Sequence, residues 1–345
     1  LTANQVKALS SDQLKALDAN QVKSLSSDGV ALIDAAHIVG IDSADIATMS
    51  TAQVSAINTS ALAAMNTAQV SKLTSDQIIS LSTAQAKALI STQIAKLDST
   101  QLQSIEATDI AVFNSTQLNA IDSTLIEKLT TDQIQALNTT ALAGLDDAHV
   151  SKLTTTQIES LTVAQAKALT AGQLTKMDSV QIKSLGTAQI AVLNSTQVTA
   201  IDSADIANMT SDQVRALNTL SLSKLTTAQI EKLTTDQVAA LTTAQAKALT
   251  ATQVTKMSSD QIKSLAAAAV GVMTSTQINA IDSADLVVMS DEQVKSINAS
   301  GITGMTSSLM SKLTSNQIAA LTTAQIKAMS TDQVKGLTTA QAANG

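Results

Sequence analysis

The chain has 345 residues, of which 44% are apolar and 14% are charged, and it contains no Trp, Tyr, Cys or Pro. Its formal net charge is −7, with 21 Lys and Arg against 28 Asp and Glu, and Phe113 is its one aromatic residue. This composition excludes disulfide and thiol chemistry. It also argues against nucleic-acid binding, because the chain lacks a basic stripe and stacking aromatic side chains. No apolar run approaches the roughly 20 residues that a membrane span needs.

Residues 2–345 divide into 43 octads without an insertion, and residues 242–249, Thr-Thr-Ala-Gln-Ala-Lys-Ala-Leu, are a typical octad. Position 1 is usually Ser, Thr, Asp or Asn, and position 4 is Gln in 29 octads. A capping residue followed three positions later by Gln is a capping box, which starts an α-helix. Positions 5 and 8 are apolar and share one face of such a helix. Each octad therefore predicts one short helix.

The octads do not fit one long helix or a stack of strands. In a continuous helix the apolar pair would rotate by about 80° per octad, so its stripe would soon face solvent. Strands need alternating apolar residues, whereas the spacing here is three and then five. A helix of about six residues is unstable alone and must be held by its neighbours. We therefore predict an all-α solenoid, one continuous array over residues 1–345 that bends at or next to position 1 of each octad.

A longer period of ten octads, here called the super-repeat, lies over the octads. The sequence Ala-Gln-Ala-Lys-Ala-Leu recurs at 84–89, 164–169 and 244–249, and Ile-Asp-Ser recurs at 41–43, 121–123, 201–203 and 281–283. Most octads without Gln alternate with octads that have it. This alternation favours two octads per coil, which would place every super-repeat on the same face. Three octads per coil stays open and would rotate successive copies.

The choice of Gln at position 4 points to a role between coils. A column of Glu in adjacent coils would repel itself, whereas Gln keeps the capping hydrogen bond without a charge. Its amide can also bond to the next coil. We predict that Gln caps its helix or forms an amide ladder through the stack.

Candidate chemical sites are few. His37 and His149 occupy the Gln position, and because neither has a second His or Cys nearby in the repeat, we interpret them as substitutes for the capping Gln. The sequence Asp-Ser-Ala-Asp at 42–45, 202–205 and 282–285 predicts an N-cap followed by an acid in the first turn, rather than a calcium site. No nucleophile elbow or phosphate loop is present. We predict no catalytic, cofactor-binding or metal-binding residue, and no enzyme.

The charges suggest self-association. Lys and Arg are missing from residues 24–71, 97–127, 184–214 and 264–294. The last three windows share acidic residues and extra apolar residues, from which we predict a lateral contact with the Lys-bearing stretches of a neighbouring copy through Val112, Asp122, Val192, Asp202, Val272 and Asp282. Leu1 occupies position 8 of an octad that the chain does not contain, and we predict that it forms a head-to-tail contact.

Residues 225–230, Leu-Thr-Thr-Ala-Gln-Ile, and residues 233–238, Leu-Thr-Thr-Asp-Gln-Val, resemble the Leu-Thr-x-x-Gln arrays of long, secreted or cell-surface bacterial proteins. The resemblance implies an extracellular structural or adhesive role. We predict an extracellular rod, or a component of a filament or matrix. The alternative is a surface-binding protein, an adhesin whose rows of Ser and Thr bind carbohydrate or ice.

Overall fold

A computed structural model describes residues 1–344. Within them, 41 α-helices and two 3-10 helices follow one another, one in each octad, and no strand is present. The all-α solenoid is therefore confirmed. The chain forms two compact units, Leu1–Leu169 (unit 1) and Thr170–Gly345 (unit 2). The single continuous array stays a prediction.

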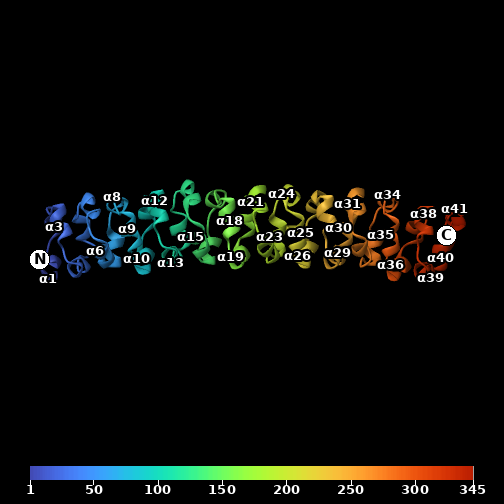
Figure 1. Ribbon diagram of the computed structural model, residues 1–345, viewed down its shortest axis with the longest axis horizontal. Helices are drawn as coiled ribbons and strands as arrows, with labels where there is room; N and C mark the ends of the chain where they lie inside the picture. Colours follow the sequence, from blue (N-terminus) through green and yellow to red (C-terminus); the bar gives the residue numbers. More distant parts are fainter. Residues whose placement is uncertain (345) are drawn as a thin grey trace. The chain divides into compact units, whose positions relative to one another are not determined.

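The elements of unit 1 run in sequence order along the stack, from blue to green in Figure 1. They are α1 (Ala3–Lys7), α2 (Ser11–Lys15), α3 (Ala19–Lys23), α4 (Ser27–Ala31), η1 (Ile38–Gly40), α5 (Ser43–Ile46), α6 (Thr51–Ala56), α7 (Thr59–Ala64), α8 (Thr67–Ser71), α9 (Ser75–Ile79), α10 (Thr83–Ala88), α11 (Ser91–Ile94), α12 (Ser99–Gln103), α13 (Ala107–Ile110), α14 (Ser115–Leu118), η2 (Ser123–Lys128), α15 (Thr131–Ala136), α16 (Thr139–Ala143), α17 (Asp147–Val150), α18 (Thr155–Ser160) and α19 (Val163–Ala168).

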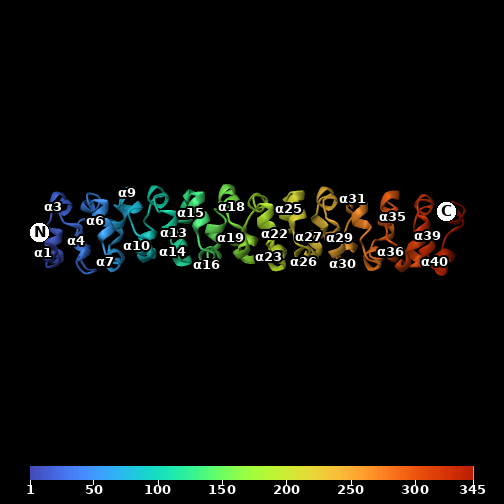
Figure 2. The same ribbon diagram turned by 60° about the horizontal axis from the view of Figure 1, so that its bottom comes forward.

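Unit 2 repeats this arrangement, from green to red in Figure 2. Its elements are α20 (Ala171–Lys176), α21 (Ser179–Lys183), α22 (Thr187–Ala191), α23 (Ser195–Ala200), α24 (Ser203–Asn208), α25 (Ser211–Ala216), α26 (Thr219–Lys224), α27 (Thr227–Lys232), α28 (Thr235–Ala239), α29 (Thr243–Ala248), α30 (Ala251–Thr255), α31 (Ser259–Ser264), α32 (Ala267–Val270), α33 (Ser275–Asn279), α34 (Ser283–Leu286), α35 (Asp291–Ser296), α36 (Ala299–Gly304), α37 (Ser307–Met310), α38 (Ser315–Ala319), α39 (Thr323–Ala328), α40 (Thr331–Lys335) and α41 (Thr339–Asn344).

Each helix ends through extended residues rather than a left-handed turn. In α15 the N-cap Thr130 has φ −72° and ψ 160°, and Leu137 at position 8 has φ −55° and ψ 129°. No residue in the described part of the chain has a positive φ. Because position 8 and the following position 1 are both extended, the chain bends where the sequence predicted. The bends need no Gly, which explains how the fold forms with ten of them in the whole chain.

A coil contains three octads, so the expectation of two octads per coil is wrong. Helices pack against the third element along the chain, as in α7 with α10, α10 with α13, α24 with α27 and α26 with α29. A coil of two octads would require the chain to reverse after every helix, and a tight reversal usually needs a left-handed residue. The extended residues that link the octads here turn the chain by less than a full reversal. The chain therefore returns above itself after three octads.

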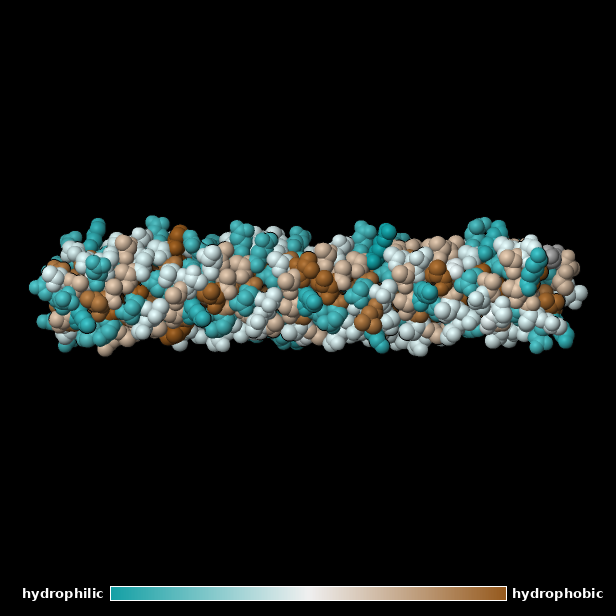
Figure 3. Space-filling model, turned by 90° about the horizontal axis from the view of Figure 1, so that it is seen from below, coloured by the Kyte–Doolittle hydropathy of each residue, from teal (hydrophilic) through white to brown (hydrophobic). Residues whose placement is uncertain are grey.

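The core is a column of aliphatic side chains from positions 5 and 8. Ile158 and Leu161 in unit 1 and Val214 and Leu217 in unit 2 are each at most 4% exposed, and Phe113 is fully buried. Positions 1, 3 and 6 are mostly exposed in the described coils. On the face drawn in Figure 3 the apolar surface residues form small, separate groups among polar ones. Burial of the two apolar positions is what holds the short helices in place.

The three-octad coil rotates the super-repeat. Because each octad packs on the third octad along the chain, the helices of a unit form three stacks, here called columns. Ten octads are three coils and one further octad. Equivalent octads of successive super-repeats within a unit therefore lie in different columns. In unit 2, α24 stacks with α27, α30 and α33, whereas α34, its equivalent one super-repeat later, stacks on α31. Asp202 and Asp282 cap α24 and α34 respectively. The expectation that they share one face is therefore wrong.

Candidate functional site

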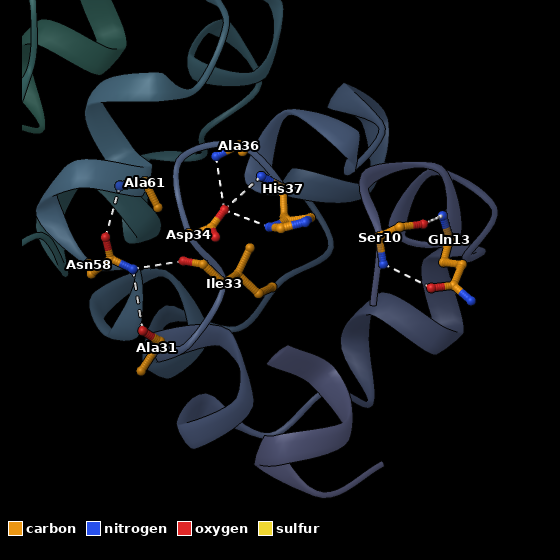
Figure 4. A network of polar contacts seen from close by, with 9 residues as sticks. All are labelled: Ser10, Gln13, Ala31, Ile33, Asp34, Ala36, His37, Asn58 and Ala61. Carbon is orange, nitrogen blue, oxygen red and sulfur yellow. Dashed lines mark hydrogen bonds and ion pairs between the residues drawn. The ribbon is translucent and has the colours of Figure 1, made fainter. Parts of the chain in front are cut away.

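The Gln of each regular octad forms the predicted capping box. In α15, Gln133 Oε1 accepts from the backbone N–H of Thr130 at 2.9 Å, and the backbone N–H of Gln133 donates to Thr130 Oγ1 at 3.2 Å. The same reciprocal pair joins Ser10 and Gln13 in Figure 4. These bonds satisfy two backbone N–H groups that the start of a helix otherwise leaves to water.

The amide nitrogen of the same Gln joins two coils. Gln133 Nε2 donates to the backbone oxygens of Leu102 and Ile105, at 2.8 and 2.7 Å, at the end of the octad that contains α12. In unit 2, Gln245 Nε2 donates to the backbone oxygens of Val214 and Leu217 at 2.9 and 2.8 Å. Each start of a helix thus lies over the junction between two octads of the preceding coil. Both Gln side chains are 2% exposed.

These contacts confirm the role of Gln in capping and between coils, but they correct its predicted partner. The amides do not pair with one another in a ladder; they bond to backbone carbonyls. Gln suits this position because its amide supplies two N–H donors and one carbonyl acceptor, and three groups of matching type surround it. An ionised Glu has no donor. The chemistry of the site, rather than repulsion between neighbouring coils, therefore explains the choice of Gln.

A second kind of octad moves the bridging amide from position 4 to position 1. Asn138 is the N-cap of α16, and its Oδ1 accepts from the backbone N–H of Ala141 at 2.8 Å. Its Nδ2 donates to the backbone oxygens of Ala111 and Phe113, at 2.9 and 2.8 Å, in the coil before. Asn58 does the same with Ala31 and Ile33 (Figure 4).

The exchange of Gln for Asn has a signal in the sequence that we did not interpret. The octads that open with Asn58, Asn138, Asn218 and Asn298 all carry a small residue at position 4, namely Ala61, Ala141, Ser221 and Gly301. In each of them the Asn amide replaces the missing Gln amide. Some octads without Gln therefore keep the bond between coils by another route.

We expect Asn138→Asp to destabilise its coil by about 1 kcal/mol, because Asp keeps the cap but cannot donate to the two carbonyls. Asn114→Asp is the matched control. Asn114 also caps a helix, through a bond of 2.9 Å from the backbone N–H of Gln117, but Gln117 provides the bridge there. The control should be neutral or slightly stabilising, since Asp is favourable at a helix start. Amide hydrogen exchange at α16 and α14 measures both effects, and equal losses would contradict the assignment.

His149 replaces Gln in the bridge but not in the reciprocal cap. Its Nε2 lies 2.7 Å from the backbone oxygen of Ile121, and its Nδ1 lies 2.6 Å from Asp146 Oδ1. The hydrogen bond to His149 lowers the pKa of Asp146. His37 makes the equivalent contact with Asp34 at 2.6 Å (Figure 4). Within residues 1–344, no group of three or more His, Cys, Asp or Glu is placed to hold a metal ion.

The Asp-Ser-Ala-Asp segments cap helices, as predicted. The backbone N–H groups of Ala44, Ala204 and Ala284 each donate at 2.8 Å to the side chain of the first Asp. Burial raises the pKa of the second Asp in the first two segments, Asp45 and Asp205, and the neighbouring carboxylates add to the shift.

Asp109 stands at the Gln position of α13 and is 2% exposed. Burial raises the pKa of this carboxyl, although a hydrogen bond with the side chain of Thr83 opposes the shift. A carboxyl whose pKa is raised by folding stabilises the fold most below its unfolded value of about 3.9, and this contribution is lost as the pH rises through the folded pKa. Asp109→Asn should therefore stabilise unit 1 at pH 7 and lose that advantage near pH 3. Thermal unfolding at the two pH values tests this, and a constant difference would contradict it.

The predicted contact residues lie apart from one another. Val112, Val192 and Val272 are partly exposed at position 7 of their octads, while Asp122, Asp202 and Asp282 are exposed N-caps two octads further on. In a coil of three octads, each Val therefore occupies a different column from the Asp of its own window. Leu1 is 68% exposed. The lateral and head-to-tail contacts stay predictions.

None of the helices described in residues 1–344 has the length and hydropathy to cross a membrane.

No protein with a curated description matches the chain. A family model, the ALTTAQ repeat, matches seven segments, some of which overlap: residues 38–75, 126–163, 174–211, 198–235, 206–243, 219–251 and 310–344. Residues 240–245 read Ala-Leu-Thr-Thr-Ala-Gln. Because these matches cover more than half of a chain whose octads build a solenoid through the Gln of that motif, the chain belongs to the ALTTAQ repeat family.

Proposed function

We propose that this chain is a non-enzymatic structural protein that self-associates into an extracellular filament or matrix. The observation that supports this most is the bridging of successive coils by amides that bond to backbone carbonyls. Gln133 and Gln245 each join the start of their own helix to an octad of the preceding coil, and buried Gln residues with such bonds recur through both units. Among residues 1–344 no buried side-chain nitrogen or oxygen lacks a hydrogen-bond partner. Such units resist local opening, which suits a load-bearing role.

The location outside the cell is part of the proposal. It is supported by the resemblance to secreted and cell-surface arrays. The absence of Cys agrees with it, because such a chain needs no disulfide chemistry to fold in an oxidising environment.

Electron microscopy and sedimentation of the purified chain test the function. We expect fibres, sheets or bundles that grow with protein concentration. A chain that stays monomeric at every concentration and ionic strength would contradict self-association. Detection of the native protein on intact cells by an antibody tests the location, with a cytoplasmic protein as the control for lysis.

A second candidate, binding of carbohydrate or ice, is supported by rows of hydroxyl groups. Thr67, Ser91, Ser115 and Thr139 occupy position 2 of octads that stack through α8, α11, α14 and α16, and all four side chains are at least partly exposed. A glycan array and a measurement of thermal hysteresis test this candidate. Binding by monodisperse protein, without fibres, would favour it over the structural role.

A further inference from the structure

Unit 2 carries alternating bands of charge along its sequence. Residues 184–214 contain three Asp and no Lys or Arg, and residues 264–294 contain four Asp or Glu and no Lys or Arg. Residues 215–263 contain six Lys or Arg against three Asp or Glu, and residues 295–344 contain four Lys against one Asp. We call these the first and second acidic bands and the first and second basic bands. A coil takes three octads, so each band extends over more than one coil and all three columns.

Unit 2 has equal numbers of basic and acidic residues, whereas unit 1 has an excess of acidic ones. Residues 170–345 contain 12 Lys or Arg and 12 Asp or Glu, whereas residues 1–169 contain 9 and 16. Two copies of unit 2 therefore approach without net repulsion, while two copies of unit 1 repel. When one copy of unit 2 is shifted by about five octads against a parallel neighbour, its acidic bands lie beside the neighbour's basic bands. The chain thus supplies its own complementary surface.

Particular side chains repeat this offset. Lys247 follows Asp202 by between five and six octads, and Lys327 follows Asp282 by the same interval. Both lysines are exposed, as are Asp202 and Asp282, which cap α24 and α34. The offset is thus shared by equivalent residues of two super-repeats.

The columns decide how many neighbours these groups can reach. Asp202 belongs to the octad of α24, which stacks with α27, α30 and α33. Asp282 belongs to the octad of α34, which stacks on α31, α28 and α25 in another column. Because the two exposed carboxylates lie on different sides of unit 2, one straight neighbour cannot contact both. Each has to meet a separate copy.

We propose that unit 2 binds two further copies of this chain on different sides, one through Asp202 and the other through Asp282, each against the basic band of a parallel copy shifted by about five octads. This inference rests on the proposed self-association and adds its partner, direction and valence. A chain that contacts copies on different sides builds a branched matrix. A chain with one contact face would build pairs or a flat ribbon.

The test uses two matched variants of the full chain. Variant one is Asp202→Asn, and variant two is Asp282→Asn. Asn preserves the N-cap, so each variant removes one exposed charge at position 1 of its octad without removing the cap. Each should weaken one lateral contact by about fivefold, since a single exposed ion pair contributes modestly. The double variant should weaken both contacts.

Sedimentation velocity and electron microscopy distinguish the outcomes. At the lowest protein concentration at which the wild type forms bundles that thicken in three dimensions, each single variant should form thin strings or ribbons, and the double variant should be monomeric. Lys247→Glu with Lys327→Glu should reproduce the double variant. If either single variant loses all association, or keeps wild-type bundles, the two-sided contact is wrong while self-association stands. If the wild-type protein itself stays monomeric, the proposed function fails instead.

Discussion

Gln133→Glu is expected to destabilise unit 1 by about 3–5 kcal/mol at pH 7, the range for a buried charge that lacks its partner. The introduced carboxylate can still accept from the N–H of Thr130. Its second oxygen, however, would stand where Nε2 now donates to the carbonyls of Leu102 and Ile105 at 2.8 and 2.7 Å. Three acceptors would then face one another in a site that is 2% exposed in the native side chain.

Gln135→Glu is the control for this variant. Gln135 lies two residues later in α15 with an exposed side chain, so the substitution changes the same amide to the same charge in the same helix. It should alter the free energy of unfolding by no more than about 0.5 kcal/mol. The difference between the variants should shrink as the pH falls below about 4, where the introduced carboxyl binds a proton in either state. Denaturation and amide exchange at α12 and α15 measure it, and equal losses would show that the bridge contributes little.

Gly304→Ala is expected to destabilise unit 2 by about 2–3 kcal/mol through overpacking. Gly304 ends α36, which stacks on α33, and a Cβ built on it would overlap the Cβ of Ser275. The two coils cannot separate freely, because Asn279 Nδ2 donates to the Gly304 oxygen at 2.7 Å and its Oδ1 accepts from Thr306 N–H at 3.0 Å. The substitution must shift backbone as well as side chain.

Gly172→Ala should stabilise unit 2, whereas Gly304→Ala destabilises it. Gly172 lies inside α20, where the nearest atom to a new Cβ is Thr170 Oγ1 at 3.8 Å. Ala should therefore stabilise that helix by about 0.5–1 kcal/mol, through the smaller entropy that it loses on folding. Thermal unfolding of the two variants gives the comparison. If both substitutions changed the unfolding temperature in the same direction, contact with Ser275 would not explain the effect at Gly304.

The helices and their caps were predictable because their signals are local. Thr130 and Gln133 lie three residues apart, and the capping box depends on that spacing alone. The apolar pair Ile134 and Leu137 likewise identifies the buried face within one octad. The all-α class and the bend at each octad therefore follow from the sequence.

The number of octads per coil was not predictable in this way. It depends on the backbone angles at residues such as Leu137 and Asn138, and many apolar and capping residues adopt them equally well. The alternation of octads without Gln suggested two per coil, but part of that pattern reflects the exchange of a Gln amide for an Asn amide. The second role of Gln133, as a donor to Leu102, needed the coil geometry before its partner was visible.

The bonds between coils have a consequence for how such an array gains and loses length. Gln245 and Asn138 recognise carbonyl groups of the backbone, which every octad has, rather than particular side chains. A deletion or duplication of one octad would therefore leave the next coil able to form the same bonds. It would also move every later surface residue to the adjacent column. Duplication of three octads would keep every later surface residue in its column. Binding surfaces should therefore survive the gain or loss of a whole coil better than the gain or loss of a single octad.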